Sequence, residues 1–169
     1  MKMKVTGLKT FLQLTAVISI VGVCSTVQAA ATVVNLQVNA SQTKLEITTR
    51  GNCSTNNTNG CLKASGKAQF NFVLTGDKSC SAGGNWKMAN VVLGMSEGSK
   101  GNITSKAAAD FNANQSSGVV TPDSSNDSHI QIKDDNTAAY EVFYTVTATC
   151  NGMPSIDSDP RIINDGTGR

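Results

Sequence analysis

Polar and apolar residues alternate with a period of two in several short stretches of this chain, which is the pattern of strands with one buried face. In 68–74 the pattern places Phe70, Phe72 and Leu74 on one face. In 139–150 it places Tyr144, Val146 and their neighbours at even spacing on one face. Runs of Asn, Ser, Thr, Gly and Asp separate these stretches, and such residues favour turns. The predicted strands cover 32–38, 44–49, 68–74, 86–93, 129–133, 139–150 and 161–163.

About eight short strands with polar turns predict an all-β fold, a single β-sandwich of the Ig-like or Greek-key kind. A small β-barrel is the alternative, and the alternation does not separate the two. The stretch 98–127 is the least regular. Within it, 105–111 is compatible with one or two helical turns that have Ser105 as N-cap. The remainder, 112–127, is predicted to be a surface connection.

The first 29 residues have the features of a secretory signal peptide. Lys2, Lys4 and Lys9 precede an uncharged, mostly apolar run at 11–23, and small residues follow at 29–31. We therefore expect cleavage after Ala29, a single domain at 30–169, and a periplasmic or extracellular location.

Charge argues against a nucleic-acid partner, and hydropathy argues against a membrane span. The whole chain has a formal net charge of +2, and removal of residues 1–29 takes away three lysines and no acid, which leaves −1. Because no cluster of Lys and Arg remains, no nucleic-acid partner is expected. No second apolar stretch has the length of a membrane span, so no integral membrane span is expected either.

Four cysteines follow the signal and would enter an oxidising compartment, where disulfides are favoured over metal or redox sites. They allow three pairings, of which we favour Cys53–Cys61 with Cys80–Cys150. The first would staple a polar loop, and the second would tie the turn before 86–93 to the end of the longest strand. A zinc site built from all four thiolates needs closely spaced pairs, which the chain lacks.

One motif suggests catalysis. Residues 94–98 match Gly-x-Ser-x-Gly, with Ser96 as the candidate nucleophile and His129, the single histidine, as its candidate base. A helix should begin at that serine, but 99–102 is a poor helix start. We therefore expect a chance match and no enzyme, and keep a small secreted serine hydrolase as an alternative.

Acidic residues near the C-terminus are the candidate metal ligands. Asp157, Asp159 and Asp165 offer oxygen atoms to calcium, as does the stretch 134–136, but none has EF-hand spacing. Turns explain them more simply, so no metal and no cofactor is expected. Trp86, Tyr140 and Tyr144 could stack on a ligand, although so few aromatic residues are needed in the core.

The C-terminal part carries a resemblance. An aromatic alternating strand at 140–147 leads to Asp159-Pro160-Arg161-Ile162-Ile163-Asn164. This ending resembles the DP-EP family of small bacterial β-sandwich proteins, in which a similar strand precedes Asp-Pro-x-Ile-x-Asn. The resemblance implies a compact sandwich and brings no catalytic residues with it.

Together these patterns favour an exported, non-enzymatic β-sandwich. Its role would be to bind a protein or carbohydrate partner, or to serve as a structural module of the envelope or surface. The loops 51–61 and 98–127 are the expected binding surface, because loops carry recognition on rigid sheets. A further alternative is a fimbrial-type subunit that is completed by a donated strand.

Overall fold

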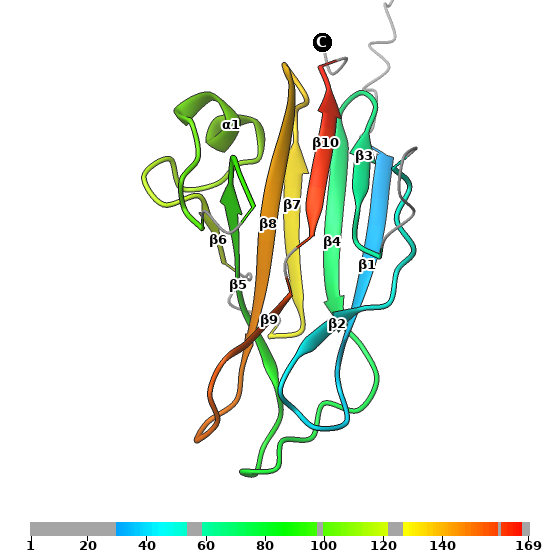
Figure 1. Ribbon diagram of the computed structural model, residues 1–169, viewed down its shortest axis with the longest axis vertical. Coiled ribbons are helices and arrows are strands. Elements are labelled where there is room, and N and C mark those ends of the chain that lie inside the picture. Colours follow the sequence, from blue (N-terminus) through cyan, green and yellow to red (C-terminus); the bar gives the residue numbers. More distant parts are fainter. Residues whose placement is uncertain (1–29, 54–58, 98–99, 122–126, 159, 167–169) are drawn as a thin grey trace, which may run out of the picture.

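The computed structural model describes residues 30–53, 59–97, 100–121, 127–158 and 160–166. This part of the chain forms two mixed sheets, packed together, and a single short helix (Figure 1). The all-β sandwich is therefore confirmed, and the barrel alternative is wrong because the sheets do not close on each other. Within the described residues, no helix has the length and apolar character needed to span a bilayer.

The first sheet has four strands, and its parallel pair could not be foreseen from alternation. Residues 30–36 of β1 run parallel to 68–74 of β4, whereas β2 pairs antiparallel with β1 and β7 pairs antiparallel with β4. The order across the sheet is β2 (Leu45–Ile47), β1 (Ala30–Val38), β4 (Ala68–Leu74) and β7 (His129–Asp134).

The second sheet is organised around its longest strand. β10 pairs with the first half of β8, and β9 pairs with the second half along the same edge. β5 lies on the other side of β8, beside residues 143–149, with an irregularity in the register between Met88 and Asn90. The order is β3 (Leu62–Ala64), β10 (Arg161–Asp165), β8 (Ala139–Thr149), β5 (Lys87–Gly94) and β6 (Val119–Val120), with β9 (Ile156–Ser158) beside β8.

The inward faces of the two sheets form one hydrophobic core. Phe70, Phe72 and Leu74 are at most 1% exposed, as the alternation in 68–74 predicted. Phe72 meets Tyr144 of β8 edge to face, with ring centroids 5.0 Å apart, so the sheets contact through aromatic as well as aliphatic side chains. On the alternating face of 139–150, Val142, Tyr144, Val146 and Ala148 are buried as well, and Tyr140 is half-buried.

Helix α1 (Ser105–Asp110) is present, but its N-cap is Thr104 and not Ser105. The Thr104 backbone is extended, and its Oγ1 accepts from the Ala107 N–H at 3.3 Å. Thr and Ser are both favourable N-cap residues. The conformation of the loop after β5 decides that Thr104 is the cap and that Ser105 is the first residue of the helix.

The far end of α1 is fixed by a buried carboxylate, Asp110. Thr137 donates to it from Oγ1 at 2.7 Å and from the backbone N–H at 3.2 Å, and the Tyr140 hydroxyl donates as well. The Asp135 N–H donates to the Asp110 carbonyl at 2.9 Å. A buried charge needs such donors, so this cluster holds α1 against the turn between β7 and β8.

Strands β3, β6 and β9 were not predicted. Each has only two or three residues, which is too short for a period of two to be recognised. The expected surface connection at 112–127 also proves to be partly ordered: it contains a turn at 114–118 and then β6. Residues 122–126 of this segment lie outside the described residues, as do the expected signal peptide at 1–29 and Asp159.

Candidate functional site

An open groove of about 460 Å³ lies between two edge strands, β7 of the first sheet and β6 of the second. Figure 1 shows β6 and α1 at one side of the molecule, next to β5, and β1 and β3 at the opposite side. The groove lining is mostly polar, which suits a polar ligand. Its described residues are Asn112, Val119, Val120, Thr121, His129, Gln131 and Lys133.

The β7 wall of the groove follows directly from its alternation. Ile130 and Ile132 are fully buried in the core, so the intervening His129, Gln131 and Lys133 face outward. His129 was singled out from the sequence, whereas Gln131 and Lys133 were not. The same alternation over 129–133 contained the signal that could have found them, since it assigns all three residues to one polar face.

The β7 backbone adds a row of hydrogen-bonding groups at this edge. The Leu74 N–H donates to the Ser128 carbonyl at 2.9 Å, and this bond sets the phase of the antiparallel β4–β7 pair. Because bonded and non-bonded positions alternate in such a pair, the N–H and C=O groups of His129, Gln131 and Lys133 point away from β4. Among the described strands, β7 pairs only with β4, so these groups form a free sheet edge.

The β6 wall is positioned by a glycine. Gly118 has φ +62°, its N–H donates to the Asn114 carbonyl at 2.7 Å, and its carbonyl accepts from Leu93 N–H at 2.9 Å. A Cβ at this position would lie 2.7 Å from the Leu93 carbonyl oxygen. Only glycine combines this conformation with this close approach, and the result is that Val119 and Val120 pair with β5.

Three side-chain amides lie beside the groove on the outer face of the first sheet. Asn71 Oδ1 accepts from Gln69 Nε2 at 3.0 Å and from Gln131 Nε2 at 3.2 Å. These two bonds orient all three amides. No hydrogen bond between described residues includes Asn71 Nδ2 or the Oε1 atoms of the two glutamines.

The described lining of the groove carries one positive charge and no negative charge. Lys133 is the one charged side chain in its described lining, and none of the ion pairs between described residues includes it. The acids at the two ends of β7 are already matched, Asp127 by Lys87 at 2.6 Å and Asp135 by Lys67 at 3.7 Å. A ligand that carries a negative charge would therefore meet Lys133 without competition from these acids.

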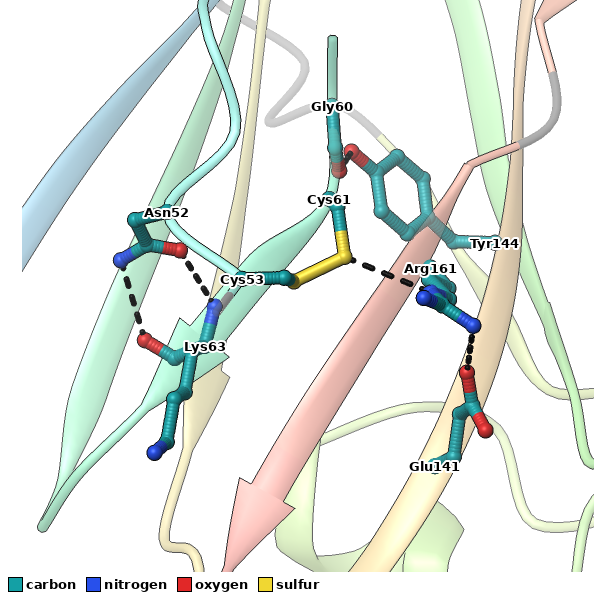
Figure 2. Close-up of a disulfide and its surroundings, with 8 residues drawn as sticks. All are labelled: Asn52, Cys53, Gly60, Cys61, Lys63, Glu141, Tyr144 and Arg161. Atoms are coloured by element: carbon teal, nitrogen blue, oxygen red, sulfur yellow. Dashed lines mark hydrogen bonds and ion pairs between the residues drawn. A yellow bond between two sulfur atoms is a disulfide. The ribbon is translucent and has the colours of Figure 1, made fainter. Parts of the chain in front are cut away.

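The Cys53–Cys61 disulfide lies at the opposite side of the second sheet, near β3 and β10, and Figure 2 shows its surroundings. Arg161 Nε donates to Cys61 Sγ at 3.3 Å, while Arg161 Nη1 contacts Glu141 Oε1 at 2.8 Å. Asn52 mimics a strand partner for Lys63, since its Oδ1 accepts from the Lys63 N–H at 2.6 Å and its Nδ2 donates to the Lys63 carbonyl at 3.3 Å.

The chain next to this disulfide is held in the core by Tyr144, whose hydroxyl donates to the Gly60 carbonyl at 2.7 Å (Figure 2). Burial raises the pKa of Tyr144 well above its ordinary value, because the phenolate would lose its hydration. Gly60 has φ +81°, and a Cβ there would lie 2.7 Å from the Ile47 side chain. These contacts give the first disulfide a structural role.

The Cys80–Cys150 bond ties the segment before β5 to the residue after β8. Both disulfides join the pairs that the spacing favoured.

The two expected binding loops, however, do not come together. Segment 98–127 contributes Asn112, Val119, Val120 and Thr121 to the groove, whereas 51–61 precedes β3 at the opposite edge of the second sheet.

The structure does not bring Ser96 and His129 together. The Met88 N–H donates to the Asp127 carbonyl at 2.7 Å, which places the residues before His129 beside the start of β5. β5 then runs about 20 Å to Gly94 before Ser96 is reached. The helix of this region begins at Ser105 and not at Ser96. The two side chains therefore lie near opposite ends of β5, outside the hydrogen-bond reach that a nucleophile and its base need.

The calcium candidates are also apart. Asp157 pairs with Thr147 and Asp165 with Ala139, which are separated by about 26 Å along β8. Asp157 Oδ2 contacts Lys100 Nζ at 2.5 Å, and Asp159 lies outside the described residues. No group of three potential metal ligands occurs within the described part of the chain.

The aromatic candidates belong to the interior. Trp86 and Tyr144 are each 1% exposed, and Tyr140 donates to Asp110.

Comparison with known proteins adds nothing to the site: no protein-family model matches the chain, and no curated protein is significantly similar to it.

Proposed function

We propose that this chain is an exported, non-enzymatic β-sandwich that binds a partner in the periplasm or outside the cell, through the groove between β6 and β7. The observation that carries the proposal is the groove itself, in which polar side chains, a free sheet edge and one unmatched cation converge. Export is supported by the signal-like residues 1–29 and by two disulfides, which are typical of oxidising compartments. The resemblance to the DP-EP family stays a prediction.

The test is a binding screen that depends on the groove. The mature protein would be applied to arrays of glycans and of peptides, together with Thr121→Trp, which fills the groove, and Ser65→Trp, which adds the same side chain at an exposed position on the β3–β4 turn. We expect wild type and Ser65→Trp to bind the same ligand and Thr121→Trp to lose it. Binding that Thr121→Trp leaves intact, or no binding at all, would contradict the proposal.

The serine hydrolase alternative has its own experiment. Folded mature protein would be exposed to a fluorophosphonate probe next to Ser96→Ala. Because Ser96 and His129 lie near opposite ends of β5, no labelling is expected. Labelling of wild type that disappears in Ser96→Ala would establish an activated serine and reject the binding-only function.

A further inference from the structure

The free edge of β7 offers what an added strand requires. Three alternate residues present both a backbone N–H and a C=O to the groove, and main-chain bonds of this kind give affinity in strand-addition complexes. We propose that an extended peptide of a partner protein, with acidic residues at alternate positions, docks on β7 as a fifth strand of the first sheet. This inference rests on the proposed binding function and names its ligand.

The groove has the size for such a strand. One residue of an added strand fills about 160 Å³, given ~3.3 Å of rise, ~4.8 Å between strands and ~10 Å between sheets. The groove of about 460 Å³ therefore holds about three residues below its rim. Its length along β7, from His129 to Lys133, matches the free row of backbone groups.

The side chains that face the groove define a two-residue pattern. A peptide residue opposite Lys133 would place its side chain on the outer face, within cross-strand distance of the ammonium group, where a carboxylate is favoured. The next peptide residue would point inward, toward the half-buried Val119 and Val120, where an apolar side chain is favoured. The expected ligand therefore alternates acidic and apolar residues.

Charge argues for this ligand over a second copy of the chain. Self-pairing of two β7 edges in antiparallel register, centred on Gln131, would set Asp127 of one copy opposite Asp135 of the other. It would also set Lys133 opposite His129, which offers no carboxylate. In this register Lys133 gains no carboxylate from a second copy, whereas a strand with an acidic residue at that position supplies one.

The experiment uses blocked heptapeptides and the mature protein. The probe alternates Val and Glu, and its control has Lys in place of Glu. Binding would be measured by calorimetry, and protection of the His129, Gln131 and Lys133 amides by hydrogen exchange. We expect the Glu peptide to bind about tenfold or more tightly than the Lys peptide, with protection at these three amides.

Two variants at one position separate backbone docking from side-chain contact. Gln131→Pro removes an outward N–H that β4 does not use, a location where proline is tolerated in a strand. Gln131→Ala removes the side-chain amide and keeps the N–H. We expect about a tenfold or greater loss for Gln131→Pro and a change within about threefold for Gln131→Ala. If Gln131→Pro does not fold, peptides N-methylated on alternate residues test backbone docking instead. Methylation of the residues whose N–H groups bond to β7 should abolish binding, and methylation of the residues between them should not.

A charge reversal tests the ligand class. Lys133→Glu should change the preference from the Glu peptide to the Lys peptide, while Lys106→Glu, on the exposed side of α1, should leave it unchanged. Equal binding of the two peptides to wild type, or indifference to N-methylation, overturns strand addition. An array ligand that Thr121→Trp abolishes but Gln131→Pro retains would overturn this inference alone and leave the proposed function standing.

Discussion

At the scale of single residues, the interior shows how buried polar groups are supplied with partners. Asp110 accepts from Thr137 and Tyr140, and Asn136 donates from Nδ2 to the Gly66 carbonyl at 3.1 Å and accepts from the Gly166 N–H at 2.7 Å. Each of these bonds joins segments that are far apart in the chain. Buried groups without such bonds would be costly, so these residues help to fix the ends of the sheets.

Tyr144→Phe should destabilise the domain and change its response to alkali. The substitution leaves the Gly60 carbonyl without its donor, at about 1–2 kcal/mol. Because the folded-state pKa of Tyr144 is raised, the unfolded state ionises first above about pH 10. The wild-type unfolding free energy should then fall by ~1.4 kcal/mol per pH unit more than that of Tyr144→Phe. Urea unfolding at several pH values from 8 to 11 measures the difference, and parallel curves would contradict it.

Gly118→Ala should be more damaging than a matched substitution at Gly66. Both glycines have positive φ, +62° and +76°, but a Cβ at Gly118 would meet the Leu93 carbonyl at 2.7 Å, whereas nothing lies within 4 Å at Gly66. We expect a loss of about 1 kcal/mol for Gly66→Ala from backbone strain alone, and of about 3 kcal/mol for Gly118→Ala. Equal midpoints of urea unfolding for the two variants would contradict this order and show that the turn before β6 accommodates a Cβ without strain.

At the scale of elements, the function that we propose depends on which strands end a sheet. β7 could be predicted together with its polar face. Its position at the edge of the sheet, however, follows from its pairing with β4, in which Gln131 lies opposite Asn71, 60 residues earlier in the chain. β6 was missed because two residues carry no periodicity. The candidate site could therefore be predicted only in part: segment 98–127, which supplies the opposite wall, was an expected binding loop, whereas His129 was singled out only as a candidate base and Gln131 and Lys133 were not.

The two disulfides close loops of different length, so their removal should lower the unfolding free energy by different amounts. Cys80–Cys150 spans 70 residues and Cys53–Cys61 spans 8. On the chain-entropy estimate, replacing both cysteines by serine should cost about 4.5 kcal/mol for the first pair and about 2.5 kcal/mol for the second. Urea unfolding of the two double variants would give this order, and a larger loss for Cys53/Cys61 would contradict it.

At the scale of the whole molecule, the described residues build both sheets from their own strands. We therefore expect the exported protein to be a discrete monomer. Intact mass after non-reducing size exclusion should lack residues 1–29 and be four hydrogens lighter than the reduced chain. A ladder of assemblies would contradict this expectation and favour the fimbrial-type subunit.

The sequence by itself determined the all-β class of fold and the inward faces of 68–74 and 139–150, because a period of two is a local property, and it favoured the cysteine pairs that the structure joins. It also placed 161–163 in a strand after Pro160, where β10 begins. Only the tertiary structure decided between sandwich and barrel, set β1 parallel to β4, and separated Ser96 from His129. Those outcomes depend on which strands pair across long stretches of chain, and pairing is governed by the complementarity of whole faces and edges, which no local pattern contains.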